Sequence, residues 1–359
     1  MNEQELKVSA PGRICLFGEH QDYFGLPIIA AAINLSITIS GKRRHEPRIS
    51  IDMPDIGEKE CLPLGEKLEY SKARDYLKSA VNILQREGLI LDSGWDCLIR
   101  GTVPINSGTA SSSSLVVAWT KFLLEAGQDQ RAGIPESIAN MAFMAEVAEF
   151  KEPGGKMDHY STALGGVISI HFENQLQVKQ LNHNLGSFVL ADSLQRKDTT
   201  GTLGYIKTHV LNGVKKIQKQ RREFQLKTSS LQEYTENIDQ LDNEERGLLR
   251  GTLLTRDLTA KGEALFESGT FDPIQFGALL SHQQAVLHNN LKISTPKIDQ
   301  MLEAAIQAGA LGGKGNGSGG GGCVFVYSPD RAEDVAEALR RLDTKPFIIN
   351  IGEGVRIES

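Results

Sequence analysis

A single glycine-rich segment near the C-terminal end limits how this chain can fold. Residues 312–322 hold eight glycines in eleven positions, out of 36 glycines in 359 residues. The segment stands between an amphipathic helical pattern and an apolar, strand-like run at 323–327, a place where compact proteins have short, ordered loops. A flexible linker does not suit that place. We therefore expect this backbone to lie directly against another element or a ligand, at a distance that side chains would prevent.

Composition narrows the class of protein. An apolar content of 40% and a charged content of 23% are typical of a globular protein, and the length predicts about two domains. The net charge of −6 argues against a nucleic-acid binder. No apolar run approaches about 18 residues and the N-terminus lacks a secretory signal, so we expect no membrane segment and a cytoplasmic protein. The four cysteines lie far apart, without a CxxC pair, and are expected to be reduced.

The order of predicted elements favours an α+β architecture. Short strands are expected within the first 60 residues, at 95–101 and between 165 and 192, with helices at 69–87, 112–126 and 135–150. Residues 205–262 are charged and helical, and their basic and acidic residues balance, which favours a solvated helix face over a basic patch. The remaining residues predict helices at 272–289, 296–308 and 331–342, and strands at 323–327 and 346–351.

The first chemical constellation is APGRICLFGEHQDY, residues 10–23. A strand that carries Arg13 runs into a turn at Gly18, after which Glu19, His20 and Asp22 follow within four residues. Carboxylates accept hydrogen bonds from hydroxyls and histidine can donate or accept, so this group is suited to a polyol. A turn held together by Arg13 and the two acids is the alternative.

The second constellation is PINSGTASSSS, residues 104–114, which leads into an apolar helix. Small residues and a helix N-terminus expose backbone N–H groups to an anion, and a serine hydroxyl can ligate Mg²⁺ beside phosphates. The segment has no lysine, so it does not match the Walker pattern. A serine-rich helix cap is the alternative, although four consecutive serines exceed what capping requires.

Together these three segments, in this order, resemble the GHMP kinase superfamily. SAPGRICLFGEHQDY looks like the galactokinase signature, VPINSGTASSSSLVVA is similar to the phosphate loop, and GALGGKGNGSGGGGCVFVY is similar to the C-terminal glycine motif. AEVAEFKEPGGKMDHY resembles the galactokinase stretch that ends in Met-Asp. The chain departs from galactokinases at Cys15, Asn106, Thr109 and Ala110, and in a turn after Tyr23 that is one residue shorter.

The resemblance implies a two-domain fold, with an N-terminal α+β domain at 1–186 and a ferredoxin-like C-terminal domain at 187–359. It implies an ATP- and Mg²⁺-dependent kinase that phosphorylates the anomeric hydroxyl of a neutral monosaccharide and works as a monomer or homodimer. Two alternatives stay open: a kinase for a small alcohol such as mevalonate, and a catalytically silent sensor of sugar and ATP. The family pattern favours the sugar kinase because Arg13 and Asp22 are both present.

The resemblance also implies roles for individual residues. Asp158 would accept the proton of the attacking hydroxyl, and Arg13 would offset charge on the phosphoryl group. Ser112 and Glu146 would hold Mg²⁺. Residues expected to bind the sugar are Glu19, His20, Asp22 and Tyr205. Residues expected to bind ATP are Pro104, Asn106, Ser107, Gly108, Ala110, Ser111, Ser112, Ser113, Gly317 and Gly319. Lys314 is either a phosphate contact or solvent-facing.

Overall fold

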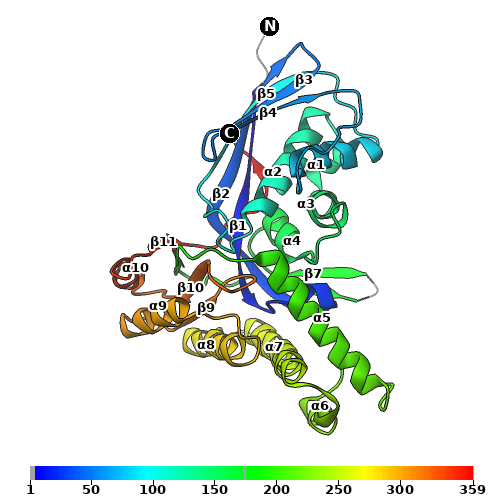
Figure 1. Ribbon diagram of the computed structural model, residues 1–359. Helices are drawn as coiled ribbons and strands as arrows, with labels where there is room; N and C mark the ends of the chain where they lie inside the picture. Colours follow the sequence, from blue (N-terminus) through cyan, green and yellow to red (C-terminus); the bar gives the residue numbers. More distant parts are fainter. Residues whose placement is uncertain (1–4, 174, 359) are drawn as a thin grey trace.

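The computed structural model describes residues 5–173 and 175–358, which form two domains built on two β-sheets (Figure 1). The larger sheet has the order β12-β1-β2-β5-β3-β4, and β6 and β7 extend it from β2. Its strands are β1 (Glu5–Phe17), β2 (Ile28–Arg44), β3 (Arg48–Met53), β4 (Glu58–Pro63), β5 (Gly94–Gly101), β6 (Val167–Phe172), β7 (Leu176–Gln180) and β12 (Arg356–Ile357).

Four helices cover one face of this sheet (Figure 1). They are α1 (Tyr76–Arg86), α2 (Ser111–Ala126), α3 (Pro135–Phe143) and α4 (Met157–Leu164). The apolar helix α2 lies in the middle, where Trp119 and Phe122 pack in the same buried cluster as Trp95 of β5. Two short 3₁₀ turns, Asp22–Phe24 and Gln130–Gly133, link neighbouring elements. Helices α2 and α4 pack directly on strands β1 and β2, and α1 and α3 pack on these helices.

The smaller sheet has the strand order β11-β8-β10-β9, and all its pairs are antiparallel. Its strands are β8 (Phe188–Asp192), β9 (Gly312–Gly315), β10 (Cys323–Tyr327) and β11 (Lys345–Ile349). Numbered along the chain, these strands run 4-1-3-2 across the sheet, with helices between the first and second and between the third and fourth. This is the expected ferredoxin-like arrangement.

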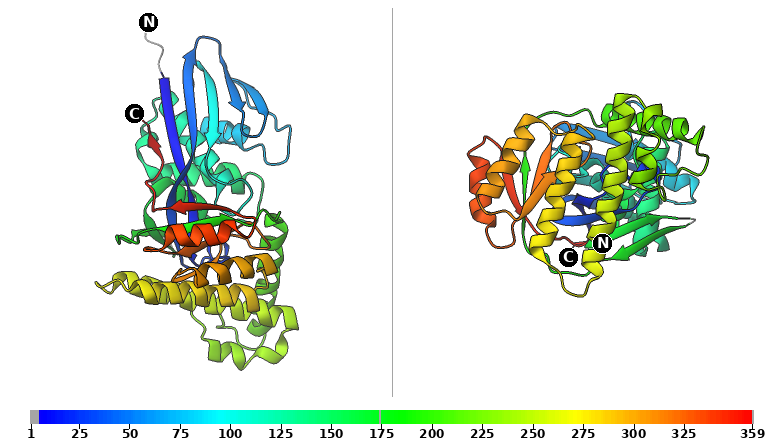
Figure 2. Two further views of the ribbon diagram at one scale, coloured as in Figure 1. Left: turned by 90° about the vertical axis from the view of Figure 1, so that its left-hand side faces the viewer. Right: turned by 90° about the horizontal axis from the view of Figure 1, so that it is seen from below.

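Alternation along β8 explains why helices and strands cover both faces of the smaller sheet. Phe188 and Leu190 pack in a cluster with the lower ends of β1 and β2, whereas Val189 and Ala191 pack against α9 and α10. Long helices α7 and α8 lie side by side below the sheet (Figure 2). The helices of this domain are α5 (Thr199–Gln218), α6 (Leu231–Thr235), α7 (Asn243–Glu267), α8 (Pro273–Asn289), α9 (Pro296–Gln307) and α10 (Ala332–Arg340), with a 3₁₀ turn at Ile238–Gln240.

The structure differs from the sequence expectations in several places. The helix expected over 69–87 begins only at Tyr76. The glycine-rich segment is not wholly a loop, because Gly312–Gly315 pairs with β10 as strand β9. The first of the short strands expected within the first 60 residues is instead one long strand, β1, with a register shift between Pro11 and Arg13. The helix expected over 135–150 ends at Phe143 and continues as a π-helical turn, Met144–Ala148. The chain's last strand, β12, returns to pair with β1 of the first domain.

The charged segment 205–262 forms a small helical subdomain with its own core. Ile206, Phe224, Tyr234 and Leu249 are members of one buried cluster. Several of its basic residues are paired with acids, such as Arg221, which contacts Glu223, Glu233 and Glu236. The solvated helix face expected there is therefore present. The four cysteines are free thiols, and Cys61 alone among them is exposed. Among the described residues, no helix is long and apolar enough to cross a membrane.

Candidate active site

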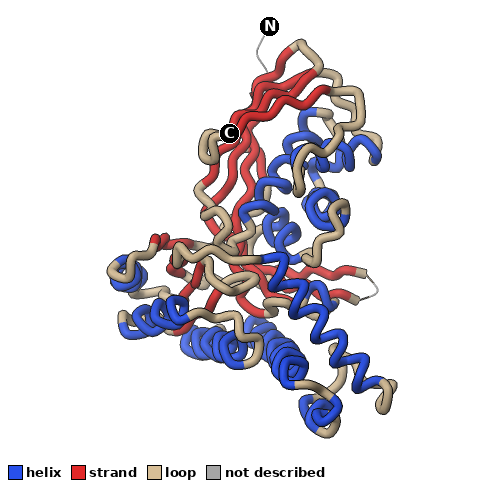
Figure 3. The backbone as a smooth tube through the Cα atoms, viewed as in Figure 1, coloured by secondary structure: helices blue, strands red, loops and turns tan. Residues whose placement is uncertain are grey.

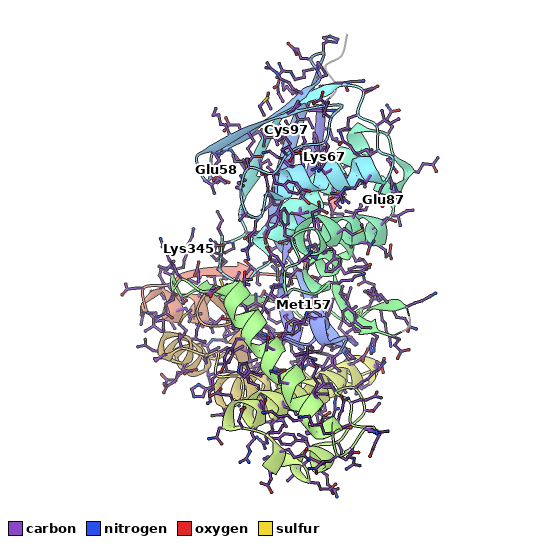
Figure 4. The ribbon with its side chains drawn as sticks, turned by 45° about the vertical axis from the view of Figure 1, so that its right-hand side comes forward. Glu58, Lys67, Glu87, Cys97, Met157 and Lys345 are labelled. Atoms are coloured by element: carbon purple, nitrogen blue, oxygen red, sulfur yellow. The ribbon has the colours of Figure 1, made fainter. Side chains whose placement is uncertain are left out.

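One pocket gathers most of the predicted site residues from segments far apart in sequence. Its lining includes Arg13, Glu19, His20 and Asp22 from the first constellation, residues of the phosphate loop, Asp158 at the start of α4, and Gly317 and Ser318 of the glycine segment. Figure 4 labels Met157, the neighbour of Asp158, near the level at which the two domains meet. In Figure 3, tan loops lie at this level between the helices and strands of the two domains. The pocket therefore lies between the domains.

The phosphate loop exposes the N-terminus of α2. Its N-cap residue is Ala110, in a left-handed conformation (φ 60°), and no side chain caps the first turn. Asn106 and Gly108 also have positive φ, at 56° and 90°. The four serines therefore do not cap the helix, because they lie inside it. Backbone strain of this kind is typical of ligand-binding loops, and free N–H groups at a helix start bind anions.

The glycine segment packs directly on the phosphate loop, as its composition predicts. Asn316 donates through Nδ2 to the Gly108 carbonyl at 2.9 Å, and the Cys323 amide donates to Ser107 at 2.7 Å. A Cβ on Gly317 would stand 2.9 Å from the Gly108 carbonyl oxygen. Any side chain at Gly317, which also has φ 78°, would push the two loops apart.

Arg13 and Asp158, 145 residues apart, form an ion pair in the pocket. Nε and Nη2 of Arg13 lie 2.8 and 2.7 Å from Oδ1 of Asp158, and Nη1 donates to the Gly108 carbonyl. Both nitrogens engage the same carboxylate oxygen. The described residues place no donor on Oδ2, which leaves that oxygen able to accept a proton or a hydrogen bond from a bound molecule.

Asp22 lies directly over the loop that precedes Asp158. Its Oδ2 accepts from the Met157 amide at 3.1 Å, and a Cβ on Gly155 would stand 2.1 Å from that oxygen. Only glycine at position 155 leaves room for the carboxylate. Burial raises the pKa of Asp22, and the nearby Asp158 charge adds to the rise. Asp22 retains lone pairs that face the pocket and can accept from hydroxyls.

Glu19 forms a buried ion pair with Lys314, which corrects both expectations for the lysine. Lys314 is 0% exposed and is not among the described residues that line the pocket. Its ammonium group donates to Glu19 Oε1, to the Cys15 carbonyl at 2.8 Å and to the Gly315 carbonyl at 3.1 Å. Burial lowers the pKa of Lys314 to about 7. The other oxygen of Glu19, Oε2, is buried without a hydrogen-bond partner among the described residues.

His20 lines the pocket, and both of its ring nitrogens have partners within the protein. Nε2 lies 3.2 Å from the Ser318 carbonyl, which can only accept, so Nε2 carries the hydrogen. Nδ1 is then an acceptor, and the Tyr23 hydroxyl, at 2.8 Å, must donate to it. The Tyr23 oxygen therefore presents only lone pairs to the pocket, which it helps to line.

The buried state of His20 predicts a pH dependence of stability. Burial lowers the pKa of His20 from 6.5 to about 4, so the unfolded chain binds its proton first as pH falls. The contribution of the neutral imidazole to the free energy of unfolding is fully present above pH 6.5, and it is lost as the pH falls from 6.5 to 4. At about 1.4 kcal/mol per pH unit, the loss reaches about 3 kcal/mol.

Urea denaturation of the wild type and of His20→Gln at pH 7.5, 5.5 and 4.5 measures this effect. The difference between the two proteins isolates the histidine from other titrating groups. We expect the wild type to lose about 2–3 kcal/mol more than the variant between pH 7.5 and 4.5. Parallel losses in the two proteins would contradict the buried neutral imidazole.

Glu146 lies in the π-helical turn, buried at the pocket wall near the start of α2. Burial alone would raise the pKa of Glu146, but hydrogen bonds from His159, Ser112 and Ser113 outweigh it and lower the pKa. The carboxylate is therefore charged. Mg²⁺ prefers oxygen ligands and binds with few protein carboxylates when phosphates complete its coordination. Ser112 and Glu146 fit that ion, and the described residues hold no group of three or more His, Cys, Asp or Glu for another metal.

Sequence reasoning missed Lys197 and His159, which also line the pocket. Nζ of Lys197 lies 2.7 Å from the point where a Cβ on Gly108 would stand. Burial, followed by the Arg13 charge, lowers the pKa of Lys197 to about 8. No local pattern marks this lysine, since it stands in the loop between β8 and α5. Its approach to the phosphate loop depends on how the two domains meet.

Four predicted residues do not line the pocket. Tyr205 lies on α5, 47% exposed, and its hydroxyl donates to Glu244 at 3.3 Å beside a separate hollow. Gly319 packs against Ile293 instead. Pro104 and Ser107 shape the phosphate loop from within, because the Pro104 carbonyl accepts from the Ser107 hydroxyl at 2.8 Å. Tyr205 and Gly319 are therefore not brought to the site.

Three family models match this chain in the order of its loops. Residues 1–43 match the galactokinase galactose-binding signature, 75–166 the GHMP kinases N terminal domain, and 250–343 the GHMP kinases C terminal. These segments hold Arg13 and Asp22, the phosphate loop with Asp158, and the glycine segment. Together they cover well over half of the chain.

Both galactokinases and mevalonate kinases are similar to this chain over nearly its whole length. A galactokinase of Mannheimia succiniciproducens is 26% identical and covers 93% of this chain and 88% of its own. A mevalonate kinase of Thermococcus sibiricus is 27% identical and covers 98% and 97%. Among structures, galactokinase of Lactococcus lactis with galactose superposes with a TM-score of 0.84 at 22% identity, covering 98% and 95%. Mevalonate kinase of Methanococcus jannaschii gives 0.74 at 18%, covering 98% and 100%.

These structures share the two-domain fold, and the family models coincide with the loops that build the pocket. The relatives are ATP-dependent enzymes that phosphorylate alcohols. The chain belongs to the GHMP kinase family, and it is an ATP-dependent phosphotransferase that acts on an alcohol group.

Proposed function

We propose that this protein transfers the γ-phosphoryl group of ATP to the anomeric hydroxyl of a neutral monosaccharide. One observation carries the choice of acceptor: Asp22 and the Tyr23 oxygen, which line the pocket, offer lone pairs but no hydrogen. Such a set needs a ligand rich in donors, and a polyol supplies them. A uronate or other carboxylate would meet repulsion there.

In the proposed mechanism, Asp158 accepts the proton of the acceptor hydroxyl through Oδ2 as the oxygen attacks the γ-phosphorus. The P–O bond to ADP breaks, and the electron pair leaves with ADP. Arg13 holds Oδ1 of Asp158 and offsets charge on the phosphoryl group. Amides at the start of α2, together with Lys197, would bind the other phosphates. Mg²⁺, held by Ser112 and Glu146, would neutralise charge on the phosphate oxygens.

A kinase for mevalonate is the second candidate, favoured by the mevalonate kinases that match the chain over nearly its whole length. The acceptor end of the pocket counts against it, since a mevalonate carboxylate would face Asp22 and Tyr23. A silent sensor is the third. It would keep the ligand-binding residues without needing the Arg13–Asp158 pair. We propose a sugar kinase because the Arg13–Asp158 pair and the hydrogen-bond acceptors of Asp22 and Tyr23 line the same pocket.

A screen of ADP release separates the three candidates. Neutral hexoses and pentoses, uronic acids and mevalonate are each supplied with ATP and Mg²⁺, and ADP is measured with a coupled assay. We expect turnover with at least one neutral monosaccharide. The turn after Tyr23 is shorter than in galactokinases, so galactose itself is expected to be a poor substrate. Turnover with mevalonate alone would favour the second candidate, and none with any acceptor the third.

Asp22→Ala tests the acceptor subsite. A hydrogen bond to a charged group contributes about 1.5–3 kcal/mol, so we expect the KM for the sugar to rise about 10–100-fold. The KM for ATP should stay within about twofold. Asp22→Asn, which keeps one acceptor oxygen, should lie between the wild type and Asp22→Ala. Equal increases in both KM values would mean that Asp22 supports the loop at Met157 rather than the sugar.

A further inference from the structure

We propose that His159 is a positioning residue for the divalent cation: its imidazole holds one oxygen of Glu146 so that the other points to the metal. This inference rests on the proposed function, which places Mg²⁺ between Glu146, Ser112 and the nucleotide phosphates. It adds a specific requirement, namely that metal affinity depends on a side chain that does not itself contact the ion.

The contact between His159 and Glu146 is short and enclosed. Nε2 of His159 lies 2.8 Å from Oε2 of Glu146, and the two side chains are 2% and 8% exposed. A carboxylate can only accept, so Nε2 carries the hydrogen. The ring of Phe143 packs edge-on against the imidazole, with centroids 5.6 Å apart at 86°. Packing therefore fixes the ring plane and, through it, the orientation of the carboxylate.

The backbone around Glu146 is built for this orientation. Glu146 lies in the π-helical turn Met144–Ala148, which follows α3 without a break. Such turns insert one residue into a helix, shift the direction of the side chains that follow, and are frequent at functional sites. Here the turn places Glu146 in the pocket wall beside Ser112 and Ser113.

The second nitrogen of His159 argues against a role in packing alone. Nδ1 is buried and has no hydrogen-bond partner in the described part of the chain. A buried nitrogen without a partner is unfavourable. His159 therefore retains an enclosed polar ring whose one hydrogen bond within the described residues goes to Glu146. Groups that orient a metal ligand in this way commonly change metal affinity 10–100-fold when removed.

A second pair with the same chemistry supplies a matched control. His171 of β6 lies 2.8 Å from Glu263 of α7, through Nε2 and Oε1. That pair is more exposed and does not line the pocket. Substitution of His171 should therefore remove a histidine–carboxylate contact without affecting a metal bound at Glu146.

The test measures metal and nucleotide binding separately on the full-length protein. Mn²⁺ serves as the probe, and its binding to the protein–ADP complex is followed by the loss of the free-ion EPR signal. ADP affinity without metal is measured by calorimetry. We expect His159→Leu to weaken Mn²⁺ binding 10–100-fold and to change metal-free ADP affinity less than twofold. His159→Gln, whose amide can donate to Glu146, should restore most of the Mn²⁺ affinity, and His171→Leu should change neither quantity.

Unchanged Mn²⁺ affinity in His159→Leu would overturn the inference and leave the proposed function intact. Equal losses of Mn²⁺ and metal-free ADP affinity would also overturn it, because they indicate a general disturbance of the pocket. If the wild type bound no ADP, the proposed function itself would fail, and this inference with it. Should His159→Leu not fold, His159→Asn replaces it, because its shorter amide does not reach Glu146 Oε2.

Discussion

Asp158→Asn is expected to lower kcat by about 10²–10⁴-fold while ADP affinity stays within about twofold. The size of the loss follows from the usual contribution of a general base, and the substitution is isosteric. An amide at this position cannot accept the hydroxyl proton, and it weakens the contacts of Oδ1 with Arg13. Steady-state kinetics with saturating sugar and calorimetry with ADP give the two quantities.

A remote arginine–aspartate pair provides the control for this substitution. Asp96 of β5 contacts Arg44 at 2.6 Å, on the far part of the larger sheet and outside the pocket. Asp96→Asn should leave kcat unchanged. A residual kcat above about a tenth of the wild-type value in Asp158→Asn would refute its role as the proton acceptor.

Lys314→Met is expected to lower the free energy of unfolding by about 3–5 kcal/mol. Removal of one partner of a buried ion pair leaves the other charge without compensation, and Glu19 is 1% exposed. Urea denaturation at pH 6.5, below the pKa of Lys314, measures the loss. Glu19→Gln combined with Lys314→Met should recover much of the stability, since neither charge is then buried alone.

An exposed ion pair is the matched control for the lysine. Lys59 contacts Asp52 at 2.9 Å across β3 and β4, and both side chains are largely in solvent. Lys59→Met should change the free energy of unfolding by less than about 1 kcal/mol. A loss of similar size in Lys314→Met would mean that the pair with Glu19 does not carry a buried charge.

The sequence predicted which loops build the site better than it predicted which side chains contact one another within the site. Arg13 and Asp158 meet as expected, and the glycines of 312–322 do lie against the phosphate loop. The family resemblance made those contacts predictable because each belongs to a motif. Strand β9 was not predictable in the same way, since glycine has little intrinsic preference for strand and only pairing with β10 makes Gly312–Gly315 a strand.

The residues that escaped prediction depend on burial and on contacts between the domains. Lys314 is expected from the sequence either at a phosphate or in solvent, yet the fold buries it beside Glu19, 295 residues earlier. Lys197 stands outside every motif, and His159 stands in the Met-Asp stretch without a predicted role; each enters the pocket from a different domain. Tyr205 shows the converse error: the family resemblance suggests a contact with the sugar, but the Tyr205 hydroxyl donates to Glu244 and the residue does not line the pocket.

The most direct test of the proposed function is the reducing power of the product made from the best neutral monosaccharide. Phosphorylation of the anomeric hydroxyl locks the ring and removes the reducing end, whereas phosphorylation at any other hydroxyl leaves it. We therefore predict that reducing equivalents disappear in step with ADP release and return after treatment with alkaline phosphatase. Full retention of reducing power during turnover, or ADP release with mevalonate and with no sugar, would contradict the proposal.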